Sequence, residues 1–437
     1  MNFAPRLAVA ALCLIAAAPS LAALTPAETR MVRTVDAEQA RHLALLAKLV
    51  NQNSGTLNLA GVKTVGEMMR AELAPLGFTV EWLDMGAAKR SGHIVARKKG
   101  SGSKLLLIGH LDTVFELDSP FQKWTLKGEK GEGPGAGDDK GGMVVMLAAL
   151  RAMQAAGTLE NADITVFLTG DEEDSGPVAI SRKALIEEGR KADAALDFEG
   201  LVRDAGRDMG SVARRSSDEW TLTVTARPGH SSGIFSAGSG HGAIYETARI
   251  IDTFRRELRE PNLTFNVGLI GGGDGATLDS GKVRIAATGK TNIIASTAIA
   301  RGDLRALSPD QIARAKARMQ TIVGQSLGGA SANIEFHPDG YPPMAPTAGN
   351  RALFNMLQAA NRDLGLPEMG ELDPVKRGAG DVSFVAADVD ALAGLGAYST
   401  GDHAPGEAVD IPSIWTQAKR AAILMSRLSS TRPRASR

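Results

Sequence analysis

Leu105-Leu106-Leu107-Ile108 is followed at once by Gly109-His110-Leu111-Asp112, so an apolar run ends in an imidazole and a carboxylate. Further along, the apolar residues 164–168 lead into Asp171-Glu172-Glu173-Asp174. Short apolar runs of this kind, separated by helical segments, are typical of buried parallel strands. Because ligands gather outside the carboxyl ends of strands in such open sheets, we expect these polar residues to form one site there.

His110 is the first candidate metal ligand. Asp112 lies two residues further along an extended segment and so points to the same side of the chain. Its carboxylate can orient the imidazole and fix the tautomer, which metal-bound histidines require. A purely structural histidine is the alternative reading.

A second polar cluster, Gly137-Asp138-Asp139-Lys140-Gly141-Gly142, opens a helix that the sequence predicts over residues 143–154. Its aspartates have a simpler alternative role as a helix N-cap, since an aspartate before a helix accepts backbone N–H bonds. The flanking glycines exceed what a cap needs. We therefore favour a carboxylate that bridges two metal ions.

The acidic residues 171–174 would repel one another without a neutralising charge, and the pKa of at least one would rise. A divalent cation is the simplest neutraliser. One glutamate would coordinate it, and its neighbour would act as general base toward a water molecule. A solvated acidic loop is the alternative. Glu199 and His403 are weaker candidates for the same metal site.

The chain has 437 residues, with 49 Lys plus Arg against 49 Asp plus Glu. The length indicates two domains, and the balanced charge gives no global field that would recruit nucleic acid or an acidic membrane. Strands alternate with helices in residues 24–215, and the pattern resumes in residues 339–437. This predicts an α/β domain with a mixed, mostly parallel sheet and flanking helices. Residues 216–338 predict an inserted α+β domain.

The first 23 residues read as a signal peptide. Arg6 precedes an apolar run at residues 7–18, and Ser20-Leu21-Ala22 fits a small-x-small cleavage site. The run is too short to span a bilayer, although an uncleaved anchor is the alternative. The only cysteine, Cys13, lies inside this segment. We therefore expect an exported protein, periplasmic or secreted, whose mature chain has no disulfide.

Taken together, the motifs resemble those of the co-catalytic di-zinc peptidase family, which includes aminoacylases, deacetylases and glutamate carboxypeptidases. The resemblance rests on four motifs in order: His110-x-Asp112, Gly137-Asp138-x-Lys140-Gly141-Gly142, Asp171-Glu172-Glu173 and Gly229-His230-Ser231. It covers essentially the whole mature chain. It is strongest toward the exported glutamate carboxypeptidases of the carboxypeptidase G type.

The resemblance implies two Zn²⁺ per chain, with Co²⁺ or Mn²⁺ as substitutes, and assigns their ligands. Asp138 would bridge both ions, and Glu172 would be the general base. The peptide bond after Asp138 is expected to be cis, and Asp112 would orient His110. The remaining ligands would be His110 and Glu199 for one ion, and Glu173 and His403 for the other.

The insert resembles the lid and dimerisation domain of that family, which implies a homodimer. His230 would reach into the active site of the partner subunit. There it would contact the substrate carbonyl oxygen, where oxyanion charge develops. Asn292 and Arg305 would hold the substrate carboxylate. Gly378 and Gly380 would line the leaving-group pocket.

Two departures from the family pattern bear on specificity and ligation. Asp197 competes with Glu199 for one ligand position. Gly340-Tyr341-Pro342 stands where glutamate-specific relatives are expected to have Gly-Arg-Pro, and Arg203 and Arg207 are candidates for the missing cation.

The sequence therefore predicts a zinc-dependent carboxypeptidase or amidohydrolase. It would cleave the amide bond to a C-terminal amino acid, glutamate first, in a small peptide or N-acyl amino acid. The alternatives are an N-acyl-amino-acid deacetylase or dipeptidase of the same family, or a metal-dead binding homologue.

Overall fold

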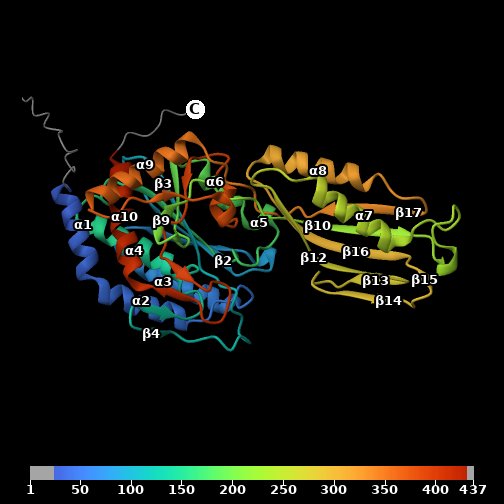
Figure 1. Cartoon of the computed structure of the whole chain (residues 1–437). Coiled ribbons are helices and arrows are strands. Elements are labelled where there is room, and N and C mark those ends of the chain that lie inside the picture. Colours follow the sequence, from blue (N-terminus) through green and yellow to red (C-terminus); the bar gives the residue numbers. More distant parts are fainter. Residues whose placement is uncertain (1–23, 431–437) are drawn as a thin grey trace, which may run out of the picture.

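A mixed sheet forms the centre of the larger domain in the computed structural model, which describes residues 24–430 (Figure 1). Its strand order is β1-β2-β6-β3-β7-β19. Strand β3 pairs in parallel with β6 and β7, and β7 pairs in parallel with β19. Strand β2 runs antiparallel to both of its neighbours, β1 and β6. The strands are β1 (Thr79–Asp84), β2 (Gly92–Lys98), β3 (Lys104–His110), β6 (Asp163–Thr169), β7 (Ala194–Asp197) and β19 (Ala391–Leu392). The predicted fold class is confirmed.

The two faces of this sheet bury different residues, as the alternation of side chains along a strand requires. Leu105 and Leu107 of β3 face a core that they share with helices α1, α2, α3, α4, α9 and α10. Leu106 and Ile108 face the opposite core, with Leu185 of α6. These helices are α1 (Pro26–Ala37), α2 (Gln39–Asn51), α3 (Leu59–Leu73), α4 (Lys140–Ala155), α5 (Val178–Ser181), α6 (Lys183–Gly189), α9 (Ala348–Asp363) and α10 (Ile411–Ser429).

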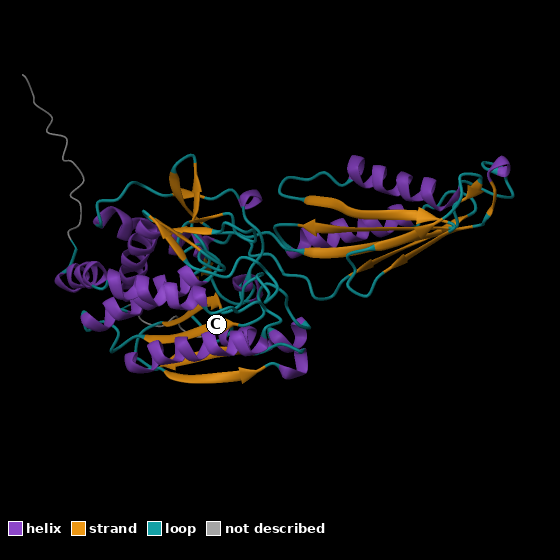
Figure 2. Ribbon diagram, turned by 90° about the horizontal axis from the view of Figure 1, so that it is seen from below, coloured by secondary structure: helices purple, strands orange, loops and turns teal. Residues whose placement is uncertain are grey.

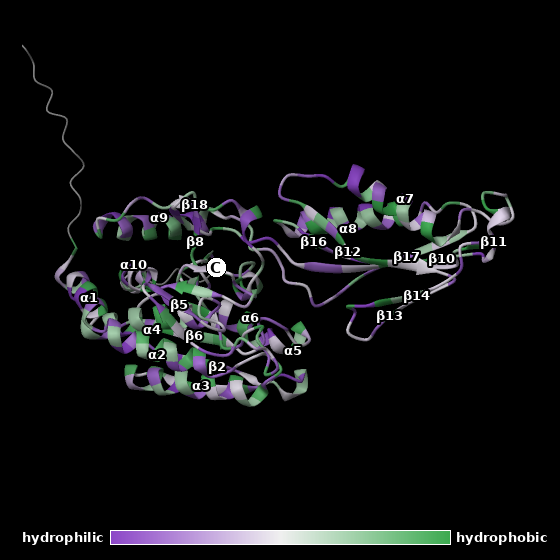
Figure 3. Cartoon of the chain, turned by 60° about the horizontal axis from the view of Figure 1, so that its bottom comes forward, coloured by the Kyte–Doolittle hydropathy of each residue, from purple (hydrophilic) through white to green (hydrophobic). Residues whose placement is uncertain are grey.

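Helix α4 is apolar on almost all sides because it is sandwiched between the sheet and the outer helices. Every residue from Lys140 to Leu150 is buried. The outer helices, such as α3, instead alternate hydrophobic and hydrophilic segments (Figure 3). The sequence predicted α4 only from residue 143, because Lys140 and the two glycines after it read as loop. Helix α10 begins at Ile411, and Pro412 is tolerated because it stands in the first helical turn.

The second body is a four-stranded antiparallel sheet with the order β12-β16-β10-β17, covered on one face by α7 and α8 (Figures 1 and 2). Trp220, Leu222 and Val224 of β10 alternate into its core, and Thr221 and Thr223 face away. The elements are β10 (Asp218–Ala226), α7 (Gly242–Glu257), β12 (Thr264–Gly273), β16 (Thr297–Arg305), α8 (Pro309–Val323) and β17 (Ala330–Phe336). All of them lie within the predicted insert, residues 216–338.

Two connecting segments join the bodies, and they pair with each other. Ser217 N–H donates to Tyr341 O at 3.0 Å, and Tyr341 N–H donates to Ser217 O at 2.9 Å. The remaining strands are β4 (Thr125–Lys127), β5 (Lys130–Glu132), β8 (Val202–Asp204), β9 (Arg207–Gly210), β11 (Gly229–His230), β13 (Gly275–Leu278), β14 (Ile285–Thr288), β15 (Ile293–Ile294), β18 (Gly370–Glu371), β20 (Ser399–Thr400) and β21 (Ala408–Asp410).

No helix among residues 24–430 has the length and apolar character needed to cross a membrane. The predicted signal peptide, with Cys13, lies outside the described residues.

Candidate metal centre

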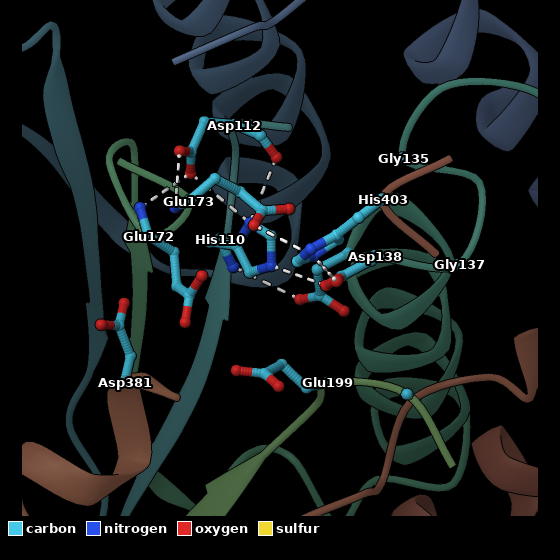
Figure 4. Close-up of polar contacts among 12 residues, drawn as sticks. His110, Asp112, Gly135, Gly137, Asp138, Glu172, Glu173, Glu199, Asp381 and His403 are labelled. Carbon is cyan, nitrogen blue, oxygen red and sulfur yellow. Dashed lines mark hydrogen bonds and ion pairs between the residues drawn. The ribbon is translucent and has the colours of Figure 1, made fainter. Parts of the chain in front are cut away.

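His110 is the last residue of β3 and is almost completely buried. Its Nδ1 lies 3.1 Å from the backbone oxygen of Asp112 and 3.4 Å from Asp112 Oδ1. Its Nε2 lies 3.0 Å from Asp138 Oδ1 (Figure 4). A proton on Nδ1 would therefore leave the Nε2 lone pair directed at the Asp138 side of the site, which is the tautomer that a metal ligand needs.

Asp112 also holds the acidic loop after β6. Its Oδ1 accepts the N–H of Glu172 at 3.0 Å, and its Oδ2 accepts the N–H of Glu173 at 3.1 Å. Thr56 Oγ1 donates to Oδ2 at 2.6 Å. The carboxylate that orients His110 thus also sets the backbone of the predicted base and of its neighbour.

Asp138 occupies the turn before α4, and its peptide bond to Asp139 is cis. Asp138 Oδ1 faces His110, and its Oδ2 lies 3.1 Å from His403 Nε2. Asp139 occupies the N-cap position of α4, but its side chain makes no capping hydrogen bond to that helix, so capping does not account for its carboxylate. Asp139 instead accepts the N–H of His110 at 3.3 Å, and a Cβ at Gly109 would lie 2.6 Å from Asp139 Oδ2. Gly109 is thus needed for close approach rather than for a sharp turn.

A ligand-like group forms where these segments converge. His110, Asp138 and Glu173 each offer one atom, and the three atoms lie within 4.8 Å of one another. His403 joins them from the loop between β20 and β21, with its Nε2 also 3.1 Å from Glu173 Oε2. The His403 ring is 55% exposed, so this side of the group is open to solvent.

Glu199 and Asp197 differ in how they are bound. Asp197 is fully buried and accepts from Arg214 Nη1 at 2.9 Å. Glu199 Oε2 lies 2.6 Å from Arg214 Nη2, but its Oε1 has no hydrogen-bond partner within residues 24–430. Gly380 lies directly against this pair, because a Cβ there would clash with Arg214 Nη1 and Glu199 Oε1. The arrangement favours Glu199 over Asp197 as a ligand.

The residues present fit divalent cations. Buried oxygens of Glu173 and Glu199 lack partners in the described part of the chain, and neutral nitrogen and carboxylate oxygen are suitable ligands for zinc-like ions. Burial raises the pKa of Glu173 to about 7. Burial, followed by the charge of Glu199, holds the pKa of Glu172 well above its usual value. Concentrated negative charge of this kind calls for a positive counter-charge.

A pocket of about 260 Å³ opens beside the group. Asp138 and Glu199 contribute to its lining, together with basic residues from strand β8 and from residues 376–377. Those basic residues are Arg203, Lys376 and Arg377. Gly378 also lines this pocket, whereas Gly380 does not belong to its lining within residues 24–430.

Residues 106–427 match the model of peptidase family M20/M25/M40. The chain belongs to this family. The relationship suspected from the motifs is confirmed.

Two named relatives show a similar sequence over part of their length. The chain is 30% identical over 266 residues to carboxypeptidase G2 of a Pseudomonas species, over 60% of this chain and 62% of that protein. It is 27% identical over 257 residues to a succinyl-diaminopimelate desuccinylase of Marinobacter nauticus, over 55% of this chain and 65% of that protein. The matched parts thus span less than two thirds of either relative.

Solved M20-type structures share the fold. A tripeptidase of Staphylococcus aureus superposes with a TM-score of 0.69 at 19% identity, covering 90% of this chain and 98% of that chain. The YXEP protein of Bacillus subtilis, described as a dinuclear metal-binding M20 peptidase, has a TM-score of 0.62 at 15% identity, covering 91% and 99%. At these identities the likeness shows the fold alone.

Two of the three predicted lid residues lie away from the metal group of their own M20 chain. His230 and Asn292 are neighbours, since β11 pairs with β15 and Ser231 N–H donates to Asn292 O at 3.0 Å. Both strands lie at the end of the insert farthest from the catalytic domain (Figures 1 and 3). Arg305 ends β16 near the connection instead, with Nη1 3.8 Å from the Cβ position of Gly378.

Glu407, which no sequence pattern singled out, is buried and lies four residues after His403. Its Oε1 accepts the N–H groups of Gly137 at 2.8 Å and Asp138 at 3.1 Å, and its Oε2 accepts Gly135 N–H at 3.4 Å. Burial raises the pKa of Glu407 to about 8. Its spacing from His403 was the only available signal, and an acid in a polar loop carries no specific meaning alone.

Tyr341, noted for its departure from the family pattern, lies beside the predicted base. Its hydroxyl donates to the backbone oxygen of Glu172 at 2.7 Å and accepts from Arg182 Nη2 at 3.0 Å. Arg182 is fully buried between Asp171 and Asp381. Of the two cations suggested as replacements, Arg203 lines the pocket, whereas Arg207 donates to the carbonyls of Glu368 and Met369.

Proposed function

We propose that the protein is a two-zinc carboxypeptidase or amidohydrolase that releases a C-terminal amino acid, with glutamate as the first expected product. The observation that carries this proposal is the group of His110, Asp138 and Glu173 within 4.8 Å, adjoined by His403 and by the buried acid Glu172. Its substrate would be a small peptide or an N-acyl amino acid with a free α-carboxylate. The similarity to carboxypeptidase G2 supports the carboxypeptidase class of the proposal.

The ligand sets follow from the contacts already described. Asp138 directs one oxygen toward His110 and the other toward His403, as a bridging carboxylate must. Glu199 would join His110 as a ligand of one metal ion, and Glu173 would join His403 as a ligand of the other. Zinc ions held there would polarise the scissile carbonyl and lower the pKa of water.

The protein's own groups would perform the proton transfers. Glu172 would take a proton from the attacking water and deliver it to the departing amine. Its backbone N–H and carbonyl are held by Asp112 and Tyr341, which fixes the point from which its side chain enters the site. A raised pKa suits a group that must both accept and release a proton near neutral pH.

The remaining roles require a second subunit. His230 lies at the far end of the insert, so it would serve the site of the partner in a homodimer formed through the lid domain. There it would stabilise the developing oxyanion, and Asn292 would contact the substrate carboxylate. Arg305, next to Gly378, would bind the same carboxylate from the connection side. Export to the periplasm or beyond is part of the proposal and rests on residues 1–23 alone.

The succinyl-diaminopimelate desuccinylase relative motivates a second candidate function, an N-acyl-amino-acid deacetylase or dipeptidase with the same metal chemistry. A metal-dead binding homologue is disfavoured, because every predicted ligand and the base are present.

The test is amino-acid release by the zinc-loaded protein from N-acyl amino acids and dipeptides, with and without a chelator. Chelator-sensitive release of glutamate from benzoyl-glutamate and folate-like substrates supports the carboxypeptidase. Preference for acetyl groups or for another residue moves the protein to the deacetylase or dipeptidase branch. No release by a protein that binds two zinc ions would refute the proposed substrate class.

A further inference from the structure

Four arginines gather around the loop at residues 375–380. Arg214 donates to Gly378 O at 2.8 Å, and Arg215 donates to Val375 O at 3.1 Å. Arg377 belongs to the loop itself, and Arg305 approaches Gly378 from the lid side. This concentration of guanidinium groups lies beside the pocket that also touches Asp138 and Glu199.

Arg377 is the member of this set that lines the pocket and is poorly neutralised. Its side chain is only 8% exposed. Its Nη2 lies 3.6 Å from Glu199 Oε2, and the same oxygen is already 2.6 Å from Arg214 Nη2. Its Nη1 donates to Gly200 O at 2.6 Å, and its Nε has no partner within the described residues.

Three other buried arginines have a close carboxylate partner. Arg182 has a carboxylate oxygen at 2.5 Å, Arg214 at 2.6 Å and Arg420 at 2.7 Å. A buried cation without such a partner is costly, so an arrangement that leaves Arg377 short of one calls for a bound anion. Glu199 cannot serve fully, since Arg214 shares it and the proposed metal would share it too.

The other basic residues of the pocket are already paired. Arg203 lies 2.8 Å from Asp208 and 2.6 Å from Asp410, and Lys376 lies 2.6 Å from Asp204. These two side chains add positive potential to the pocket, but each is already ion-paired with a carboxylate. Among the basic residues that line the pocket, Arg377 is the one whose guanidinium lacks a close carboxylate of its own.

We propose that Arg377 is a specificity-determining residue that binds a second substrate carboxylate, in addition to the α-carboxylate assigned to the lid. This rests on the proposed function. The carboxylate belongs to the side chain of an acidic released residue or to an acidic acyl group. Arg305 Nη1 lies 3.8 Å from the Cβ position of Gly378, the residue that follows Arg377 in the chain, so two guanidinium groups approach the same loop and suit a dicarboxylate.

The test compares matched substrates in the zinc-loaded full-length protein. One pair is benzoyl-glutamate against benzoyl-glutamine, and the other is succinyl-alanine against butanoyl-alanine. The wild type is expected to prefer the charged member of one pair by at least about 10-fold in kcat/KM, the scale of a hydrogen bond to a charged group. The preferred pair identifies the source of the carboxylate.

Arg377→Gln is expected to abolish that preference, mainly by raising KM for the charged substrate, with kcat for the neutral one unchanged within about threefold. Arg351→Gln is the matched control, because its guanidinium is bound to Glu371 on the surface of α9. Wild-type ratios near one in both pairs would overturn the assignment without any variant. So would a preference that survives in Arg377→Gln.

A binding measurement separates this idea from the proposed function. Glutarate, a plain dicarboxylate, is titrated into the zinc-loaded wild type and Arg377→Gln by calorimetry. Binding weakened at least about 10-fold in the variant supports the subsite even if no substrate is hydrolysed. Equal binding by both proteins, or none by either, overturns it.

Discussion

The carboxylate of Glu407 accepts a hydrogen bond from the backbone N–H of Asp138 at 3.1 Å, although 269 positions separate the two residues. The same carboxylate also accepts from Gly137 and Gly135. Because His403 lies four residues before Glu407, one acid ties the loop of one predicted ligand to the loop of another. The spacing between Asp138 and His403 is therefore set by this tertiary contact.

Glu407→Gln should weaken metal binding about 10- to 100-fold, the usual effect of disturbing groups that support metal ligands. The amide would present N–H donors to backbone N–H groups that now meet acceptor oxygens. Metal affinity measured by chelator competition checks this. Glu371→Gln, on an exposed carboxylate that binds Arg351, is the control. Unchanged metal affinity in Glu407→Gln would show that the loop holds its shape without this acid.

Glu172→Gln should bind metal almost normally and lose at least about 100-fold in kcat, the scale of a general base. The amide preserves the shape of the side chain but cannot take the proton. Metal content by elemental analysis and turnover on the best substrate provide the two readouts. Near-wild-type turnover would contradict the assigned role, and loss of metal would make Glu172 a ligand instead.

Tyr341→Phe should lower kcat by up to about 100-fold while metal content stays the same, since a small displacement of a catalytic group is costly. The variant removes the hydroxyl that bonds Glu172 O and Arg182. Thermal unfolding and steady-state kinetics measure the structural and catalytic effects separately. Tyr245→Phe, on exposed helix α7, is the control. An unchanged kcat would mean that Asp112 alone positions the base.

His230→Ala and Glu172→Ala should each be nearly inactive, yet their mixture should recover activity. If His230 acts on the partner's site, a mixed dimer has one complete site. Random exchange of subunits would then restore about a quarter of wild-type activity. Dissociation and reassociation of equimolar variants, followed by an activity assay, tests this. No recovery in a preparation proven to contain mixed dimers would place His230 in its own subunit's site or outside catalysis.

Several elements of the fold could be predicted from the sequence, because the signals that specify them are local. The apolar runs at residues 105–108 and 164–168 predicted β3 and β6, because strands buried on both faces need continuous apolar residues. Ser308 is a favourable N-cap residue, and its hydroxyl accepts the N–H of Gln311 at the start of α8. Helix α4 began earlier than predicted, because burial between the sheet and the outer helices overrides the low helix propensity of its two glycines.

The sequence by itself determined the chemical inventory: the imidazoles, the acids and the motif order that place the chain in the M20 family. Those are local properties of residue type and spacing. Only the tertiary structure decided that Glu407 holds the Asp138 loop, that Tyr341 bonds the base, and that Arg377 lacks a full counter-charge. Each of these depends on a distance between segments far apart in the chain, and such distances arise only when the sheet, its helices and the loops at the strand ends pack together.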